Sequence, residues 1–152
     1  MTHGLRVATA EDLPELYDLL IAMHSGTIAG TSPVAPEILT AAIEDALDWG
    51  VVLLAELDGE IIGSIGGIET SDWWSDELYL ADRWFFVYKE HRSSRAALTL
   101  VRSFLEVGRL AGMSVKLGHV YSGDIDRKDN FYERLGLTKV GSLYTGVNRH
   151  DG

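Results

Sequence analysis

Residues 84–105 read Trp-Phe-Phe-Val-Tyr-Lys-Glu-His-Arg-Ser-Ser-Arg-Ala-Ala-Leu-Thr-Leu-Val-Arg-Ser-Phe-Leu, and this stretch decides the fold. Its first part, 84–87, is apolar, aromatic and β-branched, as is typical of a buried strand. After a polar break, apolar residues recur at helical spacing, at Ala97, Leu100, Val101, Phe104 and Ala111. The stretch therefore predicts a strand, a tight turn and an amphipathic helix.

The turn between strand and helix carries His91, Arg92, Ser93, Ser94 and Arg95. The first N–H groups of a helix have no partner within the helix, and the helix dipole makes this end partially positive. Two arginines and two serines would surround these groups here. We expect the turn to bind an anion, and the alternative is a serine-capped helix start with solvated arginines.

Length and composition indicate one soluble domain over residues 1–152. The chain is 46% hydrophobic and 24% charged, which is typical of a globular protein. No apolar run is long enough for a membrane span, and the N-terminal residues do not resemble a signal peptide. The chain has no cysteine, which excludes a thiol nucleophile and fits a reducing compartment. We expect a cytoplasmic protein with no membrane partner.

The net charge is −10, with 23 acidic and 13 basic side chains. Such a surface repels phosphate backbones, so nucleic-acid binding is not expected, whereas a cationic small molecule or basic peptide would be attracted. Solubility alone is the simpler explanation of the charge. The five histidines are scattered, with no His-x-x-x-His or cysteine pair, so no metal site is expected.

The first half of the chain predicts two strand–helix transitions and a hairpin. We expect a strand at 5–8, a helix opened by a Thr9–Asp12 capping box, a loop at 24–36 and a helix from Pro36 to Gly50. Strands at 51–57 and 61–68 are joined by Asp58-Gly59, a strong hairpin signal. Gly63, Gly66 and Gly67 would weaken the second strand unless a bulge or a close approach requires them.

The second half predicts a βαβ unit followed by a short helix. A polar connector at 70–76 leads to a strand at 77–87, and Gly112 ends the helix that follows. The next strand, 115–121, should lie parallel to the strand at 77–87. A short helix from Asp126 to Gly136 and one last strand or broken pair at 137–147 complete the chain.

The element order and three motifs resemble the GNAT superfamily of N-acetyltransferases over nearly the whole chain. The family pattern is a strand ending in Val, then Pro-Glu-aromatic, then Arg/Gln-x-x-Gly-x-Gly/Ala at the start of a long helix. This chain has Val87, Lys89-Glu90-His91 and Arg92-Ser93-Ser94-Arg95-Ala96-Ala97. Arg92 and Ala97 match, whereas Arg95 replaces a glycine and Lys89 a proline.

Two further motifs carry the resemblance. Residues 131–137, Phe-Tyr-Glu-Arg-Leu-Gly-Leu, are similar to the family's Tyr-Glu-Lys-Leu-Gly-Phe signature, and the Asp58-Gly59 hairpin leading to Ile62-Gly63 stands where the family has it. Ile125 and Lys128 depart from the Asn and Ala of the pattern. The resemblance implies an α/β (α+β) fold, with a mixed, mostly antiparallel central sheet flanked by helices and a central βαβ unit.

By the same resemblance, the protein is an N-acetyltransferase that moves an acetyl group from acetyl-CoA directly to a primary amine. The strand end would bind the pantetheine arm through Phe85, Phe86 and Val87. The turn and helix start would bind the diphosphate through Arg92, Ser93, Ser94, Arg95, Ala96 and Ala97.

The family role of Tyr132 is to protonate the departing thiolate, and its alternative is a core aromatic. A peptide N–H at Val87 or Phe86 would stabilise the oxyanion. For the base, Asp82 is preferred over Glu69, Glu77 and a water-mediated His119. Each of these is also explained as a surface carboxylate or a core histidine.

The acceptor pocket is expected at the loop containing His24 and at Trp73 and Trp74 with their flanking aspartates, since aromatic faces and carboxylates suit an ammonium group. The alternative for the tryptophans is a hydrophobic lid or an oligomer contact, which leaves a homodimer open. The alternative function is a non-catalytic GNAT-like module that binds acyl-CoA as a sensor or interaction domain. Arg95, Ile125 and Lys128 favour that alternative.

Overall fold

The computed structural model describes residues 2–27 and 31–146. The chain divides into two compact units. One comprises Met1–Ser25 and Val34–Leu117, and the other comprises Gly26–Pro33 and Gly118–Gly152. A single domain over residues 1–152 stays a prediction.

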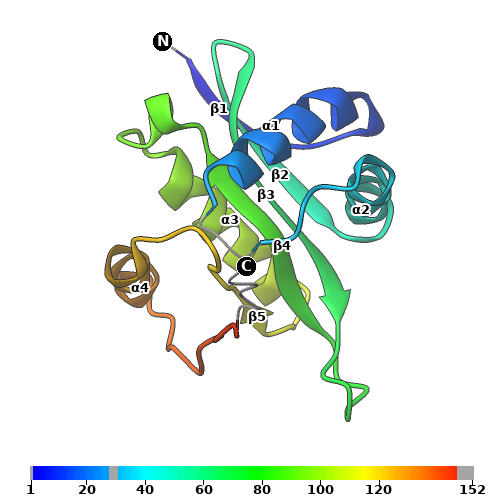
Figure 1. The fold of residues 1–152 in the computed structure, drawn as a ribbon, viewed down its shortest axis with the longest axis vertical. Coiled ribbons are helices and arrows are strands. Elements are labelled where there is room, and N and C mark those ends of the chain that lie inside the picture. The colour runs from blue at the N-terminus through cyan, green and yellow to red at the C-terminus, as the bar shows by residue number, and fades with distance from the viewer. Residues whose placement is uncertain (1, 28–30, 147–152) are drawn as a thin grey trace, which may run out of the picture. The chain divides into compact units, whose positions relative to one another are not determined.

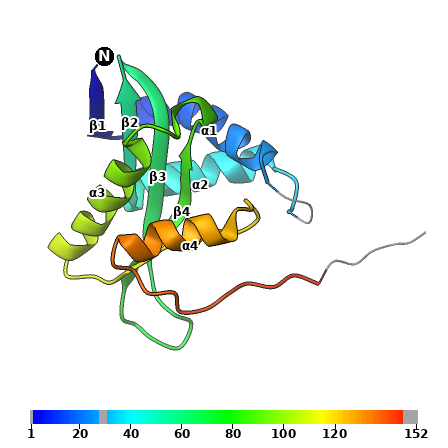
Figure 2. The same ribbon diagram turned by 90° about the vertical axis from the view of Figure 1, so that its left-hand side faces the viewer.

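The first unit is a mixed sheet with helices on both faces. Its strands are β1 (His3–Val7), β2 (Val51–Leu57), β3 (Glu60–Thr70), β4 (Tyr79–Val87) and β5 (Val115–Lys116). Its helices are η1 (Ala10–Asp12), α1 (Leu13–Ser25), α2 (Pro36–Trp49), η2 (Lys89–His91) and α3 (Ala96–Leu110). The strand order is β1-β2-β3-β4-β5, and only β4 and β5 run parallel. Figures 1 and 2 show α1 and α2 side by side on one face and α3 on the other. The predicted mostly antiparallel sheet with a βαβ unit is confirmed.

Trp84 anchors β4 in the core beneath α1 and α2. Its indole N–H donates to Ser64 Oγ at 3.0 Å, and the Ser64 hydroxyl donates to the Leu53 carbonyl at 2.9 Å. The indole lies over Gly66, because a Cβ built there would be 2.2 Å from Trp84 Cζ2. The β3–β4 register shifts between Gly66 and Gly67. Gly66 and Gly67 thus serve a close approach and a bulge, the two requirements that explain glycines within this strand.

A cluster of charges fixes β1 to the start of α1. Arg6 donates to both oxygens of Asp12 at 2.8 Å and to Glu56 Oε1 at 2.9 Å. The Thr9 N–H donates to Asp12 Oδ2 at 2.8 Å, so the predicted capping box is present. Hydrogen bonds from Arg6 and then from Thr9 lower the pKa of Asp12 to about 2, against the opposing effect of burial.

Several predicted boundaries were wrong: β1 lies at His3–Val7 rather than 5–8, β3 runs on to Thr70 rather than 68, and three further boundaries differ. Helix α1 continues through His24 to Ser25, whose hydroxyl donates to the Ala22 carbonyl at 2.8 Å, so His24 is not in the loop. Strand β4 begins at Tyr79 rather than at residue 77. Strand β5 ends at Lys116 rather than at residue 121, and Gly118 weakens any continuation because it has no side chain to pack.

The second unit contains α4 (Ile125–Arg134), the predicted short helix. Gly136 follows it with φ +87°, a left-handed conformation that suits a glycine ending a helix. The predicted last strand is wrong for 137–146, which form no strand in the part of the chain that is described. Nearly all of these residues are exposed, so apolar alternation there has no buried face to occupy. Val147 lies outside the described residues.

The contact between Gly66 and Trp84 predicts that Gly66→Ala destabilises the fold. The added methyl group must displace a buried indole that is held by a hydrogen bond, and overpacking of this kind costs about 1–3 kcal/mol. Denaturant unfolding measures the loss. Gly4→Ala in β1 is the matched control, because nothing lies within 4 Å of its built Cβ. Equal destabilisation by the two substitutions would contradict the contact.

The depressed pKa of Asp12 predicts an acid-dependent loss of stability. The carboxylate contributes stability above its unfolded pKa of about 3.9, and this contribution is lost as pH falls towards about 2. Asp12→Asn should therefore cost about 1–2 kcal/mol at pH 7 and flatten the stability profile between about pH 4 and pH 2. Unfolding measured across this range checks both effects, with the neighbouring exposed Glu11→Gln as control. A variant profile parallel to that of the parent would disprove the assignment.

Candidate functional site

The edge of β4 that faces β5 is paired over only a short length. Strand β5 pairs with Leu80 and Ala81, whereas β3 accompanies β4 as far as Val87. Residues 82–87 thus extend beyond the β4–β5 ladder. At ~3.3 Å per residue, they make an edge roughly 17 Å long that leads directly into the turn before α3.

The direction of the peptide groups along this edge follows from one hydrogen bond. The Tyr88 N–H donates to the Ile62 carbonyl of the β3 chain at 2.9 Å. Because bonding direction alternates along an antiparallel strand, Phe86 also directs its peptide groups towards β3, whereas Phe85 and Val87 direct theirs to the opposite edge. Of the two predicted oxyanion donors, Val87 is therefore the one that faces the β5 side.

The turn before α3 combines a serine cap with free helix amides. Ser94 Oγ donates to the His91 carbonyl at 2.5 Å and accepts the Ala96 N–H at 3.2 Å. The first helical bond runs from the Thr99 N–H to the Arg95 carbonyl at 3.0 Å. The N–H groups of Ala97 and Leu98 precede that bond, so they have no acceptor within the helix. The serine cap therefore leaves these two amides without a helical acceptor, and the anion site stays a prediction.

The two arginines of the turn differ in their surroundings. Arg92 Nε donates to the Val87 carbonyl at 3.0 Å, and its guanidinium lies 5.3 Å from the centre of the Phe86 ring. Arg95 is exposed, with φ −81° and ψ 3°. This backbone conformation does not require the glycine that the GNAT pattern has there. Ser93 is also exposed, and Ala96 is buried against the sheet.

The four candidate bases differ in burial and in their position relative to the β4 edge. Asp82 is half-buried, pairs with Gly67 next to the β3–β4 bulge, and is the first residue beyond the β4–β5 ladder. Glu69 is exposed near the end of β3, and Glu77 is exposed in the connector before β4. His119 belongs to the second unit.

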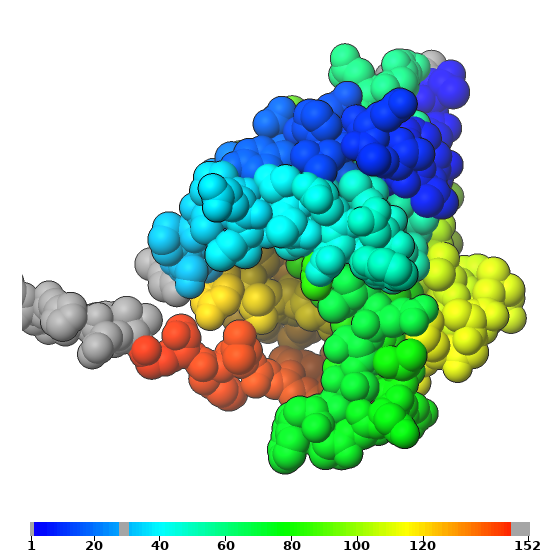
Figure 3. Space-filling model, turned by 90° about the vertical axis from the view of Figure 1, so that its right-hand side faces the viewer, coloured from blue at the N-terminus to red at the C-terminus, as the bar shows by residue number. Residues whose placement is uncertain are grey.

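The predicted acceptor residues lie on two elements of the first unit. Trp73 and Trp74 are 91% and 68% exposed and meet edge-to-face, 5.2 Å between ring centres. They lie on the connector 71–78, which projects beyond the β3–β4 pair (Figures 1 and 3). Asp72 is paired with Lys116 at 3.3 Å, so this flanking aspartate anchors the connector to β5. His24 is half-buried on the last turn of α1.

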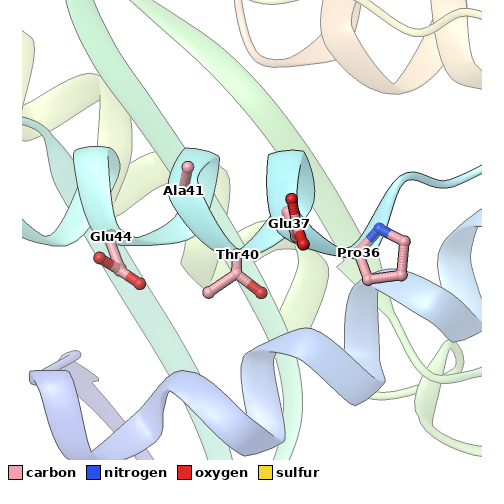
Figure 4. A pocket seen from close by; sticks show the side chains of 5 residues that line it. All are labelled: Pro36, Glu37, Thr40, Ala41 and Glu44. Atoms are coloured by element: carbon pink, nitrogen blue, oxygen red, sulfur yellow. The ribbon is translucent and has the colours of Figure 1, made fainter.

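A hollow of about 340 Å³ runs along α2 (Figure 4). Its lining comes from that helix alone: Pro36, Glu37, Thr40, Ala41 and Glu44. None of the predicted site residues contributes to it. Because one helix face cannot enclose a ligand, this hollow gives no support for a binding site.

In the second unit, the side chains of His119, Asp129 and Lys139 lie in hydrogen-bond contact, which the sequence did not predict. His119 Nε2 lies 2.8 Å from Asp129 Oδ1, and Lys139 Nζ lies 3.0 Å from Asp129 Oδ2. The His119 ring stacks on Tyr132 with centres 5.9 Å apart. Hydrogen bonds from His119 and then from Lys139 lower the pKa of Asp129. The spacing of Asp129 and Tyr132 on α4 is the only sequence signal that could have indicated the cluster.

Residues 2–27 and 31–146 contain no group of three His, Cys, Asp or Glu side chains arranged to hold a metal ion. Over the same residues, every helix is too short or too polar to cross a membrane.

Three solved structures illustrate the fold likeness. A Trypanosoma brucei acetyltransferase is 18% identical, with a TM-score of 0.70 over 96% of this chain and 99% of that chain. AAC(6')-Iy bound to the bisubstrate analogue CoA-S-monomethyl-acetylneamine is 16% identical, with a TM-score of 0.71 over 98% and 99%. The Arabidopsis thaliana glucosamine-6-phosphate N-acetyltransferase is 15% identical, with a TM-score of 0.71 over 98% and 100%. At these identities, the likeness establishes the fold.

Comparison with functionally curated proteins gave no significant match. The family comparison is positive: residues 13–137 match the model of the acetyltransferase (GNAT) family. The match covers most of the chain and includes β4, the turn, α3 and α4. The protein therefore belongs to the acetyltransferase (GNAT) family.

Proposed function

We propose that the protein transfers an acetyl group from acetyl-CoA directly to a primary amine. The observation that carries this proposal is the β4 edge from residue 82 to 87, which continues beyond β5 and leads into the free amides of α3. Membership of the acetyltransferase family implies acetyl-CoA as the acetyl donor. The edge offers peptide groups to an extended arm, and the helix start suits a diphosphate.

The described groups fit acetyl-CoA in two places. The N–H groups of Ala97 and Leu98, with the cations Arg92 and Arg95, would hold the diphosphate. Peptide groups of Phe85 and Val87 face the edge and would hold the pantetheine arm as an added strand would be held. Arg92 connects these two parts, because it contacts both the Val87 carbonyl and the Phe86 ring.

An arm laid along this edge from the turn would bring the thioester towards Asp82, where the β4–β5 ladder closes. This position supports Asp82 as the base. An alkylamine has a pKa of about 10.4, so it must lose a proton before it attacks at neutral pH. Asp82 would accept that proton, directly or through water.

The acetyl transfer then proceeds in two steps, formation and collapse of a tetrahedral intermediate. The neutral amine attacks the thioester carbonyl, a C–N bond forms, and a peptide N–H of the β4 edge near Asp82 stabilises the oxyanion, because Val87 is at the other end of the edge and would hold the arm. The C–S bond breaks as the tetrahedral intermediate collapses, the attacking nitrogen releases its surplus proton to solvent, and Tyr132 gives its hydroxyl proton to the sulfur. The products are the N-acetylated amine and the CoA thiol, and solvent returns a proton to the tyrosinate.

The acceptor we propose is a small-molecule or peptide amine that carries positive charge. The net charge of −10 attracts cations, and the exposed faces of Trp73 and Trp74 suit an ammonium group. AAC(6')-Iy was solved with an acetylneamine-based bisubstrate analogue, which supports a polycationic amine as the first class to test. His24 is retained as an acceptor-site residue in this proposal.

A binding module without catalysis is the second candidate. The Ala96 N–H already donates to Ser94, and Arg95 stands where the family has glycine. In this second candidate, acyl-CoA binds at the turn, but its thioester is not aligned with an acceptor amine. Turnover on an amine panel separates the two candidates, because a sensor binds acetyl-CoA and releases no CoA thiol.

Calorimetric titration with acetyl-CoA, followed by a thiol-release assay over polyamines, aminoglycosides and amino-terminal peptides, tests the proposal. We expect binding and amine-dependent thiol release. Arg92→Ala should weaken acetyl-CoA binding about tenfold, since it removes a cation and the contact to Val87. Arg102→Ala, at an exposed position on α3, is the matched control. Binding with no turnover on any amine would support the sensor instead.

Tyr132→Phe should lower kcat by about 100-fold and leave the acetyl-CoA affinity unchanged, because only the transferable proton is removed. Steady-state kinetics and calorimetry on the same preparation measure the two quantities. Tyr144→Phe is the control, since the Tyr144 side chain is 90% exposed. Equal turnover in Tyr132→Phe and the parent would remove Tyr132 from the acid role.

A further inference from the structure

We propose that Asp129 and His119 are positioning residues for Tyr132. Asp129 fixes the imidazole of His119, and the imidazole fixes the phenol ring. This inference rests on the proposed function, in which the Tyr132 hydroxyl protonates the leaving sulfur. All three residues lie within the second compact unit.

The first link is the contact between histidine and carboxylate. His119 Nε2 lies 2.8 Å from Asp129 Oδ1, and their side chains are only 17% and 21% exposed. An ionised carboxylate accepts hydrogen bonds and cannot donate them, so Nε2 carries the proton in this contact. The contact therefore fixes both the tautomer and the plane of the ring, as a carboxylate does for other functional histidines.

The second link is the stack between the two rings. The His119 and Tyr132 rings are 5.9 Å apart at an angle of 13°, so the imidazole covers a face of the phenol. Phe131 meets the same phenol ring at 64°, with centres 5.5 Å apart. With a face and an edge both in contact, the Tyr132 ring has fewer orientations open to it than an exposed tyrosine.

The geometry of α4 allows His119 to contact Asp129 and Tyr132 at the same time. Asp129 and Tyr132 are three residues apart, so they lie on the same side of the helix, one turn from each other. His119 comes from the segment before the helix and bridges both. A hydroxyl that must donate a proton at one atom benefits from such support, since small misplacements cost large factors in rate.

The third group, Lys139, balances the charge of the carboxylate. Its ammonium lies 3.0 Å from Asp129 Oδ2, the oxygen that His119 does not contact. Asp129 thus uses one oxygen for Lys139 and the other for His119, so both of its oxygens are held.

Positioning differs from a direct catalytic role in a measurable way. If His119 acts through Tyr132, removing His119 should matter only while the Tyr132 hydroxyl is present. If His119 were itself the base for the amine, its loss would multiply the loss caused by Tyr132→Phe.

Kinetics of four variants test this difference. His119→Gln can keep the contact to Asp129 and loses the ring, whereas His119→Phe keeps a ring and loses the contact. We expect each to lower kcat by about 5- to 10-fold, with the KM for acetyl-CoA within about twofold of the parent, and Asp129→Ala to do the same. Asp129→Asn retains an oxygen that accepts from Nε2–H, so it should recover part of the loss. Asp126→Ala, an exposed aspartate on α4, is the matched control.

The decisive comparison repeats these substitutions in the Tyr132→Phe background. There, we expect each to change kcat by less than about twofold. Losses that multiply in that background, or full activity in both His119 variants, would overturn the proposal.

A second measurement decides the inference without turnover. In protein with ring-labelled tyrosine, the Tyr132 NMR signal is identified by its absence from Tyr132→Phe. His119→Gln and Asp129→Ala should move that signal towards the position of the exposed Tyr144, and Asp126→Ala should leave it in place. An unmoved signal overturns the positioning role. Absence of turnover in the parent would instead count against the proposed function, and the NMR result would still decide whether the cluster orients the ring.

Discussion

The pairing of β4 is the constraint on which the rest of the first unit depends. On one side, β3 stays with β4 to Val87, and on the other, β5 leaves it after Ala81. An edge whose peptide groups have no neighbouring strand is costly unless it meets water or a ligand. Trp84 stabilises β4 on its β3 side, because its indole N–H donates to Ser64 and its ring packs over Gly66. The same strand is thus paired with β3 from Tyr79 to Val87, whereas β5 pairs with only Leu80 and Ala81.

Most of the fold could be predicted because its signals are local. Asp58-Gly59 predicts the β2–β3 hairpin, the Thr9–Asp12 pair predicts the start of the first helical segment, and Gly112 and Gly136 end helices with positive φ. Each signal is a requirement of the backbone within a few residues. The errors fall where no such requirement exists. Residues 115–121 and 137–147 have a strand-like composition. The length of a strand also depends on a neighbouring strand to pair with, and composition does not specify that neighbour.

In the candidate site, too, residues that are contiguous in sequence could be predicted, and residues that only the fold brings together could not. The turn before α3 could be predicted since its residues are contiguous in sequence, and the structure adds which peptide groups of 85–87 face the edge, whereas their role in binding a cofactor stays a prediction. Asp129 and Lys139 could not be predicted, because their significance comes from a histidine ten residues before Asp129 and from a stack on Tyr132. Asp72 shows the opposite case: the sequence suggested a substrate carboxylate, and its pairing with Lys116 gives it an anchoring role.

The replacement of glycine by Arg95 has a physical explanation that does not require loss of the anion site. A glycine is needed in such a loop for a positive φ or for a close approach of backbone to ligand. Arg95 has φ −81°, so the first need is absent, and its side chain is exposed rather than folded into the turn. The remaining need is space beside the amides of Ala97 and Leu98. If a diphosphate binds at these amides as we propose, the exposed Arg95 guanidinium would add positive charge there, and a side-chain contact would replace the backbone contact that a glycine allows.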